Sequence, residues 1–70
     1  MRVNWETGFR IAVRIEANGQ TVVSANREGL LSLSNILRTL ADQQPGTHIH
    51  LDEFNSLEDG SSELVLERAD

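Results

Sequence analysis

The chain contains no cysteine, which excludes disulfide bridges and thiolate metal sites. No apolar run approaches the roughly 20 residues of a membrane-spanning helix, and the first residues lack the apolar stretch of a signal peptide. There is also no G-x-S-x-G motif, no phosphate-binding glycine loop and no calcium-loop pattern. We therefore expect a cytoplasmic protein that is not an enzyme and needs no cofactor.

Basic residues are few: six face eleven acidic residues, and the formal net charge is −5. This balance argues against nucleic acid and anionic membranes as partners and is compatible with a basic protein partner. The 70 residues make a single domain, residues 1–70. Because so short a chain buries only roughly 60% of its extended surface, a homodimer is an alternative arrangement.

One long stretch, Asn26 to Gln43, has helical periodicity. Asn26 suits the N-cap, and Pro45 ends the helix because it disfavours helical backbone in the residue before it. Leu31 lies on the polar side, where it contacts either the sheet rim or a partner. At 100° per residue, one side of the helix collects the apolar residues Leu30, Leu33, Ile36, Leu37, Leu40 and Ala41.

Strand patterns lie on both sides of this helix. Residues 9–17 alternate between apolar and polar, and Asn18-Gly19 predicts a two-residue type I′ turn into a second strand over residues 20–25. Such a turn pairs Ile15 with Val22. Two further strands are expected over residues 47–52 and 62–68.

The resulting order is β-β-α-β-β, which predicts an α+β fold. We expect a four-stranded antiparallel sheet of spatial order 2-1-3-4, with the strands numbered along the chain and one helix packed on one face. The first strand is placed centrally because it is the longest apolar one. Trp5 precedes it, either as a lid over one end of the core or as an interface anchor.

His48, His50 and Asp52 alternate along the third expected strand, so their side chains share one face. Nitrogen and oxygen ligands of this kind suit zinc, and Glu63 or Glu67 could complete the set. The alternative is an ordinary polar sheet face with cross-strand pairs. A metal-binding domain is therefore a second reading of this chain.

A polar loop, Glu53 to Ser61, separates the last two strands and holds two apolar residues, Phe54 and Leu57. These two residues either close the core or form an apolar anchor, surrounded by acidic side chains, that binds a positively charged protein. In the second reading the partner-binding residues are Asp52, Glu53, Phe54, Asn55, Leu57, Glu58 and Asp59.

The segments AN-REG-LLSL, PGTHIHLD and NSLEDGSSELVLER resemble the immunity protein 32 family of small bacterial immunity proteins, over roughly Val22 to Arg68. The resemblance implies a compact α+β domain, encoded in polymorphic toxin loci, that neutralises a toxin by binding it and not by catalysing a reaction. The positions that match the family pattern are His48, His50, Asp52, Asn55, Leu57, Glu58, Gly60 and Glu63.

Overall fold

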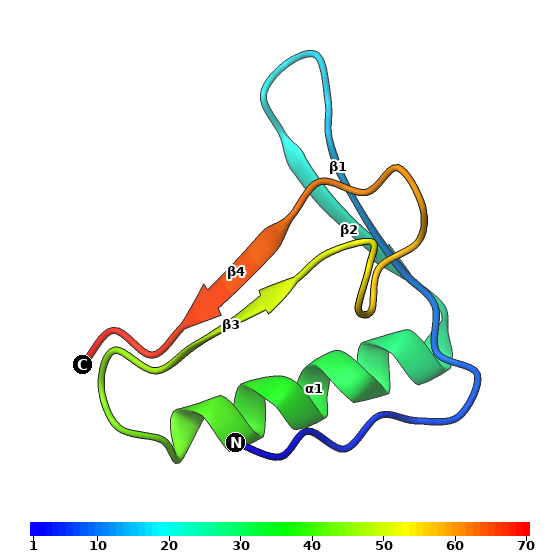
Figure 1. Ribbon diagram of the computed structural model, residues 1–70. Coiled ribbons are helices and arrows are strands. Elements are labelled where there is room, and N and C mark those ends of the chain that lie inside the picture. Colours follow the sequence, from blue (N-terminus) through cyan, green and yellow to red (C-terminus); the bar gives the residue numbers. More distant parts are fainter.

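The computed structural model describes all residues from Met1 to Asp70, and its single helix, α1, spans Arg27–Ala41 (Figure 1). The predicted N-cap is confirmed, because the Asn26 side chain accepts a hydrogen bond from the Gly29 amide at 2.8 Å. The helix ends before Asp42, three residues short of Pro45. The chain has no helix of the length and apolar character that spanning a membrane requires.

The buried face of α1 differs from the predicted one. Leu33, Ile36 and Leu40 do pack inward, but the other buried helical positions are Gly29 and Ser32. Leu30 and Leu37 are 55% and 53% exposed. Which face of α1 is buried is determined by a backbone contact and a hydrogen bond, and the hydrophobic periodicity of the sequence does not reflect either of them. Gly29 lies against the Arg10 carbonyl and Ala25, where a Cβ atom would clash, and the Ser32 hydroxyl accepts a bond from the Glu6 amide at 2.8 Å.

The predicted hairpin is present as β1 (Ile11–Ile15) and β2 (Thr21–Ala25), which pair antiparallel. Its predicted turn and register are wrong. The Glu16 amide bonds the Gln20 carbonyl, so the loop holds three residues, Ala17 to Gly19, and Ile15 pairs with Thr21 instead of Val22. Within this loop only Gly19 has a positive φ, 86°, whereas a type I′ turn would require one at Asn18 as well.

The last two strands, β3 (His48–Leu51) and β4 (Leu64–Glu67), form a second antiparallel pair. The predicted single four-stranded sheet of order 2-1-3-4 is therefore wrong: there are two separate two-stranded sheets, which Figure 1 shows inclined to each other above α1.

The reason lies at the edge of β1 that does not pair with β2. Residues 58–62 bond to this edge, where β3 was expected. The amides of Glu58 and Ser62 donate to the carbonyls of Ile11 and Val13 at 2.8 and 2.9 Å, and the Ser61 hydroxyl accepts from the Val13 amide at 3.1 Å. These bonds satisfy the backbone groups that β3 would have used.

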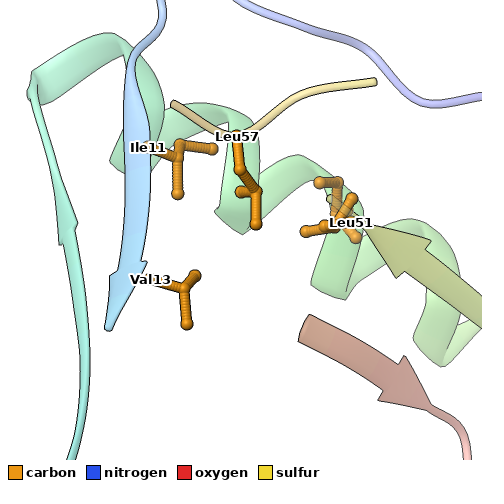
Figure 2. Packing of buried hydrophobic residues seen from close by; sticks show 5 residues of the cluster. Ile11, Val13, Leu51 and Leu57 are labelled. Carbon is orange, nitrogen blue, oxygen red and sulfur yellow. The ribbon is translucent and has the colours of Figure 1, made fainter. Parts of the chain in front are cut away.

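The core lies where the two sheets, α1 and the loop before β4 meet (Figure 2). Ile11, Val13, Ile36, Leu51 and Leu57 form its buried cluster. The N-terminal segment runs alongside α1 (Figure 1) and closes one end. There Trp5 stacks on Phe9 with ring centroids 4.7 Å apart, and both rings pack on the cluster, as a lid does.

We expect Asn26→Ala to lower the free energy of unfolding by about 2 kcal/mol, because it removes the helix cap together with bonds to Arg10 and Gly8. Asn26→Asp keeps the accepting oxygen and loses only the donation to the Gly8 carbonyl, so its loss should be smaller. Urea denaturation followed by Trp5 fluorescence measures both, and equal losses would contradict this role for the oxygen.

Candidate partner-binding site

The chain between β3 and β4 forms a loop, Asp52 to Gly60, that is folded tightly on its first residue. The amides of Asn55, Ser56 and Leu57 all donate to the Asp52 carbonyl, at 3.3, 3.0 and 2.8 Å. The Asp52 carboxylate also accepts from the Phe54 amide at 2.9 Å. We call residues 52–60 the Phe54 loop.

Side chains fasten both ends of the Phe54 loop. The Asn55 amide group accepts from the Asp52 backbone at 3.0 Å and donates to the His50 carbonyl at 3.0 Å. The Glu53 carboxylate accepts from the Gly60 amide at 2.8 Å, where a φ of 84° favours glycine. Asp52, Glu53 and Asn55, which the sequence offers as partner-binding residues, therefore also determine the shape of the loop.

The two apolar residues of the loop have different surroundings. Leu57 is 5% exposed and points toward α1 between Ile11 and Leu51 (Figure 2), as expected of a residue that closes the core. Phe54 is 90% exposed, so its ring makes almost no contact within the chain. Glu53, Glu58 and Asp59 are exposed in the same loop. The arrangement presents an aromatic ring among carboxylates on a backbone that is already ordered.

The candidate metal ligands are only partly brought together. The rings of His48 and His50 lie edge to face with centroids 5.1 Å apart, and His50 Nδ1 lies 3.4 Å from a Glu63 carboxylate oxygen. Asp52 lies beyond the end of β3, with its carboxylate in the loop. No group of three or more His, Asp or Glu side chains has the geometry of a metal site. Zinc binding stays a prediction of the sequence, for which zinc titration is the test.

The family comparison covers this region of the fold. The model of a family described as immunity protein 32 matches residues 20–69, which include β2, α1, β3, the Phe54 loop and β4. This chain belongs to the immunity protein 32 family. Curated proteins and solved structures gave no match. The match leaves out the N-terminal segment and β1, so the part shared with the family contains the loop but not Ile11 and Val13 of the core.

This immunity protein 32 family member has a second exposed apolar surface that sequence reasoning missed. It is an open groove of about 530 Å³ between α1, β2 and β4. Helical periodicity predicts Leu30 and Leu37 in the core. Both are instead more than half exposed, and their side chains line this groove. We call it the leucine groove; its apolar lining is Val23, Leu30, Leu33, Leu37, Leu64 and Leu66.

The different burial of Leu57 and Phe54 leads to opposite expectations for stability. Leu57→Ala should lower the free energy of unfolding by about 2–5 kcal/mol, because it leaves a cavity in the core. Phe54→Ala should change it by less than about 0.5 kcal/mol, since the ring is in solvent. Urea denaturation of the two variants measures the difference, and a comparable loss for Phe54→Ala would show that its ring packs on the chain.

Proposed function

We propose that this protein binds a cognate bacterial toxin through the Phe54 loop and neutralises it by covering a basic surface, without a catalytic step. The observation that carries the proposal is the 90% exposure of Phe54 in a loop whose backbone is fixed by its own side chains. Family membership supports a binding role of the immunity type. The proposal implies a cytoplasmic protein that meets the toxin inside the cell that makes both.

An exposed phenyl ring favours binding because covering it releases its apolar surface from water. Aromatic side chains in desolvated pockets are also frequent hot spots of protein interfaces. The hydrogen bonds of Asp52, Asn55 and Glu53 hold the loop before any partner arrives. Binding therefore costs less conformational entropy than ordering a free loop would.

Charge supports a basic partner. Residues 48–70 contain seven acidic residues and one arginine, whereas residues 1–47 contain four acidic residues and five arginines. The negative charge is thus concentrated in the part of the chain that holds the Phe54 loop and β4. Glu58 and Asp59 have no side-chain hydrogen bond or ion pair within the chain, so their carboxylates are available to a cationic surface. Such complementarity accelerates encounter and fixes register.

We expect Phe54→Ala to weaken binding by about 30-fold or more, as loss of an aromatic hot spot does. The measurement is calorimetric titration with the purified toxin domain encoded beside this gene, alongside survival of cells that co-express the two proteins. Wild-type affinity in the Phe54→Ala variant would contradict the proposed anchor. Absence of binding by the wild-type protein would contradict the immunity role itself.

The carboxylates of the Phe54 loop give an independent expectation. The double variant Glu58→Lys, Asp59→Lys should slow association and weaken the dependence of affinity on salt, because exposed charges act through screened long-range attraction. The double variant Asp42→Lys, Asp70→Lys is the matched control, since it changes net charge equally at exposed acids outside the loop. Equal effects of the two pairs would show that only net charge matters.

A further inference from the structure

The second strand pair leaves one backbone edge of β4 without a partner. The Arg68 amide donates to the Thr47 carbonyl at 2.9 Å, and the register pairs Leu66 with Ile49. Antiparallel bonding alternates along a strand, so the backbone groups of Leu64 and Leu66 face β3 and those of Val65 and Glu67 face away. No hydrogen bond outside the strand ladder uses the backbone of Val65 or Glu67.

This free edge of β4 borders the leucine groove. The side chains of Leu64 and Leu66 line the groove, and the rest of its apolar lining comes from β2 and α1, with no residue of β3. Successive side chains of a strand point to opposite faces. An extended segment paired with β4 would therefore place every second side chain in the groove, over Leu30 and Leu37.

We propose that the free edge of β4 and the leucine groove together bind an extended segment of a partner protein, which adds as a third strand beside β4. The backbone of Val65 and Glu67 supplies the hydrogen bonds, and the groove takes the apolar side chains. Strand addition to an exposed edge is a general mode of peptide recognition that combines these two elements.

The charges of β4 identify the chemistry of this partner. Glu63 precedes the strand, Glu67 ends it, and both are exposed on the face opposite the groove, as is Val65. In a second copy paired antiparallel about Val65, Glu63 would lie opposite Glu67, and a parallel pairing would oppose each glutamate to itself. Like charges directly opposite are destabilising, so the edge disfavours a second copy. It suits a segment in which apolar residues alternate with lysine or arginine.

The test uses the full chain and a short synthetic peptide of alternating valine and lysine. We expect the peptide to slow hydrogen exchange at the amides of Val65 and Glu67, because strand pairing engages the Val65 and Glu67 backbone, and to shift the methyl resonances of Leu30 and Leu37. A scrambled peptide and a valine–glutamate peptide should bind at least about tenfold more weakly. Equal binding of all three would overturn the proposal, as would unchanged exchange at these amides in excess peptide.

Variants separate the edge from the groove. Val65→Pro removes the outward amide and leaves the bonds of Leu64 and Leu66 to β3, so it should fold and lose about tenfold in peptide affinity. Leu37→Ser removes an apolar side chain of the groove at an exposed helical position, so it should weaken peptide binding and leave the fold intact. The double variant Glu63→Lys, Glu67→Lys should bind the valine–glutamate peptide more tightly than the valine–lysine peptide. Unaltered peptide affinity in a folded Val65→Pro variant would overturn strand addition.

The controls distinguish this surface from the Phe54 loop and from self-association. Phe54→Ala should bind the peptide as the wild type does, so failure of the toxin proposal leaves this result unaffected. Protection of Val65 and Glu67 that rises with protein concentration alone, without peptide, would mean that a second copy occupies the edge, and would overturn the assignment to a basic partner.

Discussion

The fold depends on one asparagine that joins three parts of the chain. The side-chain oxygen of Asn26 accepts from the amides of Gly29 and Arg10 at 2.8 and 3.0 Å, and its nitrogen donates to the Gly8 carbonyl at 3.0 Å. The Asn26 backbone also donates to Arg10. Helix start, first strand and N-terminal segment thus share one capping residue. This junction brings the first turn of α1 against β1 and β2 closely enough that only glycine fits at position 29.

The rotation of the helix follows from that contact. With Gly29 pressed on the strands, the positions one turn and two turns further, Ser32 and Ile36, also face inward. Leu30 and Leu37 are then left more than half exposed, on the side of α1 that faces the open groove between α1, β2 and β4. The leucine groove is therefore a consequence of how the helix is anchored at its N-terminus. Only eight of the 70 residues are buried, which leaves such apolar surface available to another molecule.

Local signals predicted the elements, and their failures have physical causes. The helix, its cap and the four strand positions follow from periodicity and from the chemistry of Asn26. The hairpin register differs from the predicted one by one residue. The reason is that Asn-Gly also fits the last two positions of a three-residue loop, which needs a positive φ only at Gly19. The predicted sheet order was wrong because Ser61 and Ser62 hydrogen-bond to the edge of β1 that β3 was expected to pair with. These serines lie in an irregular segment, and no periodic sequence pattern predicts such pairing. Composition likewise could not separate Phe54 from Leu57, since only tertiary packing buries one and exposes the other.

The acidic residues oppose self-association of a chain with this much exposed apolar surface. Phe54 lies in a loop with Glu53, Glu58 and Asp59, and Val65 lies between Glu63 and Glu67. In each place an apolar group that could attract another copy is flanked by carboxylates that would repel the same carboxylates on that copy. A basic surface meets the opposite condition, because its charge attracts before its apolar groups make contact. The same residues thus disfavour self-association and would favour the cationic partner proposed above, and the two effects would have one electrostatic origin.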